Sequence, residues 1–209
     1  MAQLFTLHPR NPQGRLISQA VAMLRAGALI AYPTDSSYAL GCLMNNPAGI
    51  RELRRIRRLE EDHFLTLVCA DLSALSSYAR VDNTVYRLLR AHTPGPYTFV
   101  LKASRDVPRK LQHPKRRTVG IRVPDHEVSS ALLEALGEPL MSTTARLPGE
   151  ELPLNDGQEI VERLNKQLAC VLDAGACAVE PTSVVDLSEG SPRVLRRGLG
   201  ALEAFELAP

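Results

Sequence analysis

Apolar residues recur along this chain at two spacings, and segments with the two spacings alternate. The first helical stripe covers residues 16–24, follows an expected N-cap at Asn11 and ends before Gly27. The apolar run at 28–32 is typical of a buried strand, which Pro33 ends because proline cannot donate to a sheet ladder. Further helices are predicted around 50–56, after Asp71, from Asp82 to about 92, over 128–136 and over 156–168. Further strands are predicted at 65–69, 97–102, 118–123, 140–143, 171–172, 183–187 and 194–195.

These helix and strand patterns interleave over the whole length of 209 residues. The chain contains no internal repeat, no low-complexity tract and no linker that would divide it. We therefore expect one domain over residues 1–209, of the α/β or mixed α+β class, in which all helices pack on one sheet. The segment 145–155 is rich in Pro, Gly and Glu and is predicted to be an exposed loop.

Composition narrows the class of protein further. Hydrophobic residues make up 44% and charged residues 23% of the chain, as in globular proteins. No apolar run approaches the roughly 20 residues of a membrane helix, and the N-terminus lacks a secretory pattern. We expect a cytoplasmic protein without a membrane partner. The cysteines at 42, 69, 170 and 177 form no C-x-x-C pair, which favours reduced thiols over a metal site.

A dense polar cluster follows the strand at 28–32. Within five positions the chain presents three hydroxyls, a carboxylate and a phenol, at residues 34–38. The exit of a buried strand is a common ligand-binding position in α/β proteins. Pro, Asp and Ser are also common turn formers, so an ordinary turn is an equal alternative.

The chain lacks the familiar catalytic signatures. It contains no P-loop, no Rossmann fingerprint, no H-E-x-x-H and no G-x-S-x-G, and its five histidines are scattered. An enzyme built on this sequence is therefore expected to act by positioning and charge stabilisation rather than through a covalent nucleophile.

Basic residues gather in three segments, at 51–58, 105–117 and 193–197, although the net charge is only +2. Most arginines of the first segment fall on one helical stripe opposite Leu53 and Ile56, where a solvated face is expected. Arg57 falls on the apolar side, which indicates either that the helix ends near Ile56 or that Arg57 points into a pocket. The one-sided charge favours a polyphosphate ligand, RNA or both.

Five segments, in chain order, resemble the signature motifs of the YrdC/YciO family. Their residues are more similar to those of the YciO branch than to those of YrdC proper. They are residues 33–41 (PTDSSYALG), 94–98 (PGPYT), 118–124 (TVGIRVP), 181–186 (PTSVVD) and 196–198 (RRG). The resemblance extends over about residues 12–200. It implies a twisted mixed sheet flanked by helices, with a basic concave face.

The resemblance also implies a reaction. Family members make threonylcarbamoyl-adenylate and pyrophosphate from L-threonine, bicarbonate and ATP, and the adenylate is used in the t6A modification of tRNA. The implied partners are ATP or an adenylate, threonine, bicarbonate and RNA, either tRNA or double-stranded. Mg²⁺ is expected to arrive with ATP rather than in a dedicated protein site.

Site residues follow by position from the resemblance. Thr34, Arg55 and Arg57 are implied to be catalytic, with Thr34 and Tyr38 holding threonine and the two arginines holding the triphosphate. Further residues are implied to bind the nucleotide, the carboxylate or the phosphates: His63, Thr118, Arg122, Ser142, Thr144, Ser183 and Arg196.

Three positions depart from the family pattern. Arg55 and His63 replace lysines, and Thr144 replaces an asparagine. These changes alter cationic and amide contacts to the nucleotide, so we expect reduced or altered synthase activity. One alternative is a non-catalytic RNA-binding protein that uses the same basic face, and another is a regulator that binds ATP without turnover.

Overall fold

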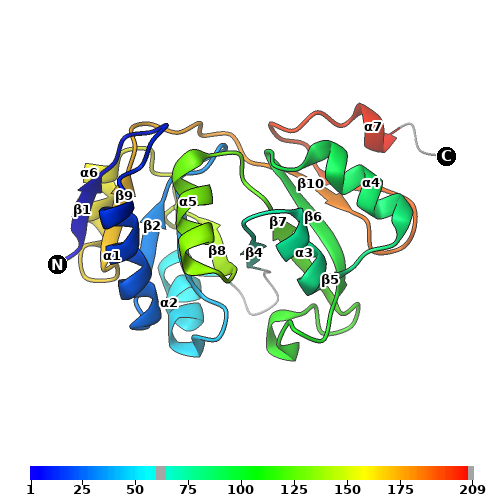
Figure 1. Ribbon diagram of the computed structural model, residues 1–209, viewed down its shortest axis with the longest axis horizontal. Coiled ribbons are helices and arrows are strands. Elements are labelled where there is room, and N and C mark those ends of the chain that lie inside the picture. Colours follow the sequence, from blue (N-terminus) through cyan, green and yellow to red (C-terminus); the bar gives the residue numbers. More distant parts are fainter. Residues whose placement is uncertain (60–64, 207–209) are drawn as a thin grey trace.

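A computed structural model describes residues 1–59 and 65–206 (Figure 1). The strands are β1 (Gln3–Thr6), β2 (Ile30–Tyr32), β3 (Ala39–Leu43), β4 (Thr66–Val68), β5 (Ala79–Arg80), β6 (Tyr97–Ala103), β7 (Thr118–Arg122), β8 (Leu140–Thr144), β9 (Cys170–Asp173), β10 (Ser183–Asp186) and β11 (Arg193–Arg196). The helices are α1 (Gly14–Arg25), α2 (Pro47–Arg57), α3 (Leu72–Tyr78), α4 (Asn83–His92), α5 (Glu127–Leu136), α6 (Gly157–Leu164) and α7 (Glu203–Glu206), with a 3-10 turn η1 (Arg109–Leu111).

All of these strands belong to one sheet. Its order is β1-β9-β2-β3-β8-β4-β7-β6-β10-β11, and β5 pairs with β6 at the side. The sheet is mixed: β9 pairs in parallel with β1 and β2, whereas β3, β8 and β4 pair antiparallel in succession. Because strands far apart in sequence become neighbours, segments from the whole chain meet on one surface.

The two faces of the sheet are covered unequally. One face packs against α2, α3, α4 and α6 through Leu40, Leu67, Phe99, Ile121 and Met141. On the other face, α1 and α5 pack over the part of the sheet from β1 to β8 and the end of β4, against residues such as Ile30, Tyr32 and Leu140. In Figure 1 these two helices lie toward the N-terminal end of the molecule, away from β6 and β10. The remaining part of this second face is open, and it carries the site described below.

The structure confirms the mixed α/β class and the packing of helices around a central sheet. It also confirms the local signals for two helices. The Asp71 side chain accepts from the Ala74 N–H, and the Asp82 side chain accepts from Thr84 and Val85 N–H, as N-caps do.

The N-cap predicted at Asn11 is wrong. Helix α1 begins at Gly14 after Gln13, and no side chain caps it. The His8 imidazole instead accepts from the Arg10 and Asn11 N–H groups, so these residues form a separate turn before the helix.

The pattern also missed strands β1, β3 and β5 and helix α7. Strand β3 follows directly on the polar cluster, and all five of its residues are buried. A strand buried on both faces lacks the polar and apolar alternation by which strands are recognised.

The cysteines Cys42, Cys69 and Cys170 are buried free thiols. Burial raises the pKa of each of these thiols to about 12, which makes them poor nucleophiles. In the described part of the chain, no helix combines the length and apolar character needed to cross a bilayer.

Candidate functional site

A cavity of about 880 Å³ opens on the uncovered part of the sheet, and we call it the main cavity. Its floor is formed by residues of four neighbouring strands: Thr66, Thr98, Thr118, Gly120 and Val184. These side chains alternate with core residues such as Leu67 and Ile121, so the same strands build the core on one face and the cavity on the other. Gly120 has no side chain and thereby leaves the middle of the floor open.

The polar cluster at 34–37 forms both a turn and a wall of the main cavity. The Thr34 hydroxyl donates to the Ser37 carbonyl at 2.6 Å and accepts from the Ser36 and Ser37 N–H groups at 3.2 Å. Thr34, Ser36 and Ser37 all line the cavity. The sequence left open whether residues 34–38 form an ordinary turn or a ligand-binding segment. In the structure both descriptions apply, because the turn presents its side chains to the cavity.

Arg122, at the end of β7, is held by this turn. It is buried, its Nη1 donates to Ser36 Oγ at 3.0 Å, and its Nη2 forms an ion pair with Asp35. Burial lowers the pKa of Arg122, and the Asp35 charge opposes that effect. Its Nε has no hydrogen-bond partner among the described residues. A buried donor without a partner makes an anion a favourable neighbour.

Arg57 is the last residue of α2, and it lines the main cavity. Arg58 follows in the left-handed conformation (φ 48°) and ends the helix. The Arg57 guanidinium donates to the Arg146 carbonyl and reaches Thr143 Oγ1 at 3.4 Å. Burial and the charge of Arg146 lower the pKa of Arg57 to about 10. Both explanations offered by the sequence hold, since the helix ends there and Arg57 turns toward a pocket.

Arg196, on the edge strand β11, reaches the main cavity from its opposite side. Its Nε donates to the Thr182 carbonyl at 3.0 Å and its Nη2 to Thr182 Oγ1 at 2.9 Å. Burial, followed by the charges of Arg146 and Arg122, lowers the pKa of Arg196. The guanidinium groups therefore repel one another across the cavity, and a bound polyanion would relieve that repulsion.

Among the described residues, six arginines line the main cavity: Arg57, Arg58, Arg116, Arg122, Arg146 and Arg196. Arg116 and Arg122 have carboxylate partners, in Asp186 and Asp35. Glu151 and Glu180 also line the cavity, so its surface is mixed in charge but dominated by guanidinium groups. Planar guanidinium groups match the oxygen pairs of phosphates and carboxylates. The arrangement can hold a ligand with several anionic groups.

A family model described as Sua5/YciO/YrdC, telomere recombination, matches residues 22–198. The chain belongs to the Sua5/YciO/YrdC family. The match includes every segment that surrounds the main cavity.

Relatives within the Sua5/YciO/YrdC family differ in how much of them the chain covers. An uncharacterized Escherichia coli protein, YciO, is 48% identical over 205 residues, which are 98% of this chain and 100% of YciO. The crystal structure of that protein superposes with a TM-score of 0.94 over the same shares. A threonylcarbamoyl-AMP synthase of Vibrio vulnificus is 33% identical over 75% of this chain and 84% of its own length. The P. abyssi Sua5 complexed with L-threonine is 26% identical, with a TM-score of 0.88 over 97% of this chain and 59% of that one.

The main cavity brings together most of the residues that the family resemblance implied. The residues of that set that line it are Thr34, Arg57, Thr118, Arg122, Ser142, Thr144 and Arg196. Ser142 accepts from the buried Tyr32 hydroxyl at 2.8 Å and donates to the Leu40 carbonyl at 3.0 Å, so its hydroxyl is already engaged. Burial raises the pKa of Tyr32 to about 12, so Tyr32 stays protonated as the donor.

Three implied family residues lie outside the lining of the main cavity. Arg55 is exposed on α2, where it forms an ion pair with Glu52. The Tyr38 hydroxyl donates to Asp173 Oδ1 at 3.0 Å and to the Gly175 carbonyl at 2.8 Å, and burial raises its pKa. Ser183 donates to the Gly200 carbonyl and accepts from the Gly198 N–H, and thereby fixes the turn after β11. His63 lies outside the described residues.

Sequence reasoning missed Arg146, Leu152 and Pro153, which come from the predicted loop and line the main cavity. Leu152 is 60% exposed although it is a large aliphatic residue. No motif marks these positions, and only the folded chain shows that they line the cavity, with the Arg146 carbonyl in contact with Arg57.

Within the described ranges, no group of three or more His, Cys, Asp or Glu side chains is arranged to hold a metal ion.

Proposed function

We propose that this protein binds Mg²⁺-ATP and a threonine-derived carbamate in the main cavity and joins them into threonylcarbamoyl-adenylate. The observation that carries the proposal is the convergence of Arg57, Arg122, Arg146 and Arg196 on one cavity. The substrates together carry a triphosphate, a carbamate and a carboxylate, which are the anions that guanidinium groups bind well.

The reaction requires stabilisation of the negative charge that develops on the phosphates, and it requires no protein nucleophile. A carbamate oxygen of N-carboxy-threonine attacks the α-phosphorus of ATP, and the bond from that phosphorus to the β-phosphate bridging oxygen breaks. Pyrophosphate leaves with the electron pair of that bond. Arginines fixed around the phosphates favour the developing charge on pyrophosphate, while Mg²⁺ arrives as part of the nucleotide substrate.

The division of the main cavity into two sides supports the assignment of substrates. Arg122 and the turn at Thr34 form one wall, where the buried guanidinium with a free Nε suits a carboxylate. Arg57 and Arg146 contact each other at the end of α2, and the resemblance implies a role of Arg57 in holding the triphosphate. The relatives named as a threonylcarbamoyl-AMP synthase and as a Sua5 complexed with L-threonine support the same substrate class.

The first test is pyrophosphate release by the purified protein with ATP, Mg²⁺, L-threonine and bicarbonate. We expect release that requires both threonine and bicarbonate, with the adenylate detected as the other product. Omission of either co-substrate is the control. Absence of release above background from a folded protein would contradict the synthase reaction.

A second candidate function is RNA binding without catalysis. It is favoured by exposed basic residues beyond the main cavity, on the segment before β7: Arg105, Arg109, Lys110, Lys115 and Arg117. For a purely RNA-binding protein, we expect strong, salt-dependent RNA affinity that Thr34→Ala leaves unchanged. Threonine-dependent turnover that is lost in Thr34→Ala would favour the enzyme, and ATP binding without turnover would indicate a regulator.

A further inference from the structure

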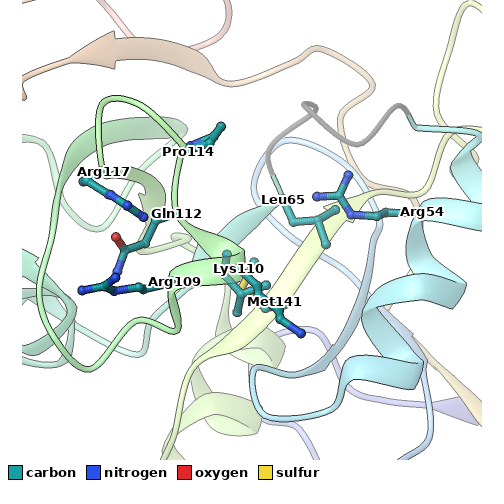
Figure 2. A pocket seen from close by; sticks show the side chains of 9 residues that line it. Arg54, Leu65, Arg109, Lys110, Gln112, Pro114, Arg117 and Met141 are labelled. Carbon is teal, nitrogen blue, oxygen red and sulfur yellow. The ribbon is translucent and has the colours of Figure 1, made fainter.

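A second cavity, of about 340 Å³, lies between α2 and the segment that precedes β7. Figure 2 shows Arg109, Gln112 and Arg117 on the loop side of this cavity and Arg54 across from them on α2. It shares Leu65 with the main cavity. Met141 lines the second cavity and its neighbour Ser142 lines the main one, and adjacent side chains of a strand point to opposite faces. The two cavities therefore meet at Leu65 from opposite faces of the sheet.

The second cavity combines cations with an apolar wall. Arg109, Lys110 and Arg117 are exposed, and no carboxylate of the described residues forms an ion pair with any of them. The apolar surface of this wall comes from Leu111 and Pro114, and the almost fully buried Leu65 and Met141 lie behind them in the cavity lining. Unpaired cations beside an apolar wall suit a ligand with an anionic group and a flat or apolar part.

The loop that carries these cations is held in place by its own hydrogen bonds. The His113 N–H donates to the Thr118 carbonyl at 2.7 Å, and the Arg117 N–H donates to the His113 carbonyl at 2.9 Å. The Gln112 amide donates to the Val107 carbonyl at 2.7 Å. Arg117 itself has a φ of 56°, a conformation uncommon for arginine. These bonds fix the backbone of the loop from which the side chains of Arg109 and Arg117 project.

We propose that the second cavity binds a nucleotide, with the phosphate on Arg109, Lys110 and Arg117 and the base against Leu65, Leu111 and Pro114. The volume lies within the usual range of about 300–1,000 Å³ for small-molecule sites. The nucleotide can come from a free mononucleotide or from one unstacked position of an RNA strand, since both present the same phosphate and base. The inference goes beyond the proposed function, because none of the three cations assigned to the phosphate lines the main cavity.

The test uses two charge-matched double variants of the same loop. Arg109→Ala/Arg117→Ala removes two cations from the second cavity, whereas Arg105→Ala/Lys115→Ala removes two exposed cations that do not line it. The probes are a short single-stranded RNA and AMP, followed by fluorescence anisotropy and calorimetry. AMP is measured in an Arg57→Ala background, so that binding in the main cavity contributes less.

We expect the Arg109/Arg117 variant to lose about tenfold or more in affinity for at least one probe, and the Arg105/Lys115 variant to lose much less. If the Arg109/Arg117 variant loses affinity for RNA alone, the ligand is a nucleotide of an RNA strand. If it loses affinity for AMP, the ligand is a free nucleotide. Equal losses in both variants would indicate diffuse charge attraction and overturn the site, as would no loss in either.

A third variant tests the apolar wall. Leu111 is half-buried and carries no charge, so Leu111→Ser leaves the electrostatics unchanged. We expect it to weaken binding of the same probe, with thermal unfolding showing that the protein is still folded. Unchanged affinity would overturn the assignment of a base to this wall. Pyrophosphate release with small substrates should be unaffected by the Arg109/Arg117 pair, which separates this inference from the proposed function.

Discussion

At the scale of single residues, neighbouring arginines of α2 have different environments. Arg57 lines the main cavity and contacts the loop at Arg146, whereas Arg55, two positions earlier, points outward and pairs with Glu52. The helical rotation between these positions is about 200°, which separates them onto different faces. The family resemblance implies both for the triphosphate, but the geometry favours Arg57.

Arg57→Ala should therefore weaken ATP binding more than Arg55→Ala does. Charge-assisted hydrogen bonds contribute about 1.5–3 kcal/mol, so we expect a loss of roughly tenfold to a hundredfold for Arg57→Ala. The Arg55 ion pair is exposed, and its removal should change affinity by less than about threefold. Calorimetric titration with Mg²⁺-ATP measures both, and equal losses would restore the pair implied by the resemblance.

Asp35 has a structural role that the sequence did not assign. It pairs with the buried Arg122, and its other oxygen accepts from the Asp125 N–H at 3.1 Å. Asp35→Ala leaves a buried guanidinium without its counter-ion, which in other proteins costs about 3–5 kcal/mol. We expect the free energy of unfolding in urea to fall by about that amount. A fall below about 1 kcal/mol would show that Ser36 and solvent are enough for Arg122.

At the scale of elements, α5 has an unusual N-cap. The His126 imidazole accepts from the Val128 N–H at 3.2 Å, a bond that requires a neutral ring nitrogen. Burial lowers the pKa of His126 below its usual 6.5, although Asp35, Glu127 and Asp125 oppose that shift. The unfolded chain therefore takes up a proton at a higher pH than the folded one does.

Stability linked to His126 is fully present above the unfolded pKa and is lost as the pH falls through the lower folded pKa. We expect the free energy of unfolding to fall between pH 7 and pH 5, and to fall less in His126→Asn, because asparagine caps helices without titrating. Urea unfolding at several pH values measures the difference. Parallel pH profiles for the two proteins would contradict the role of His126.

At the scale of the whole molecule, the main cavity joins distant parts of one sheet. Thr34 and Arg57 lie beside β3 and β8, whereas Arg196 belongs to β11, and β4, β7, β6 and β10 lie between them in the strand order. The chain carries a net charge of only +2, yet six arginines of the described residues line this cavity. A ligand that contacts both sides would connect the two halves of the sheet.

Mg²⁺-ATP should therefore raise the midpoint of thermal unfolding in a concentration-dependent manner. A ligand at a hundred times its dissociation constant stabilises the native state by about 2.7 kcal/mol if it does not bind the unfolded chain. We expect the double variant Arg57→Ala/Arg196→Ala to lose this effect, and Arg51→Ala, on the exposed face of α2, to keep it. Equal midpoints with and without nucleotide in the native sequence would argue against ATP as a ligand.

Features that depend on a few adjacent residues could be predicted from the amino-acid sequence. The caps at Asp71 and Asp82 need only a side chain and an N–H group two or three positions later. Gly137 ends α5 in the left-handed conformation, with a φ of 75°, which glycine adopts more easily than residues with a side chain do. The class of fold followed from periodicity, and the motifs at 33–41 and 118–124 contribute residues to the lining of the main cavity. Strand β3 was not predicted from the sequence, because a strand buried on both faces has no alternation of polar and apolar residues.

Which side chains share the cavity could not be predicted from local sequence, because it depends on how distant segments pack together. Arg57 meets Thr143, and Arg122 meets Ser36, across a separation of 86 residues in each case. Such contacts depend on the order of strands in the sheet, which periodicity does not encode. The fold also brought Arg146 into the cavity and left Arg55, Tyr38 and Ser183 outside its lining. Helix caps and turns can be predicted from a short stretch of sequence. The meeting of several arginines at one cavity requires that strands distant in sequence become neighbours in the sheet.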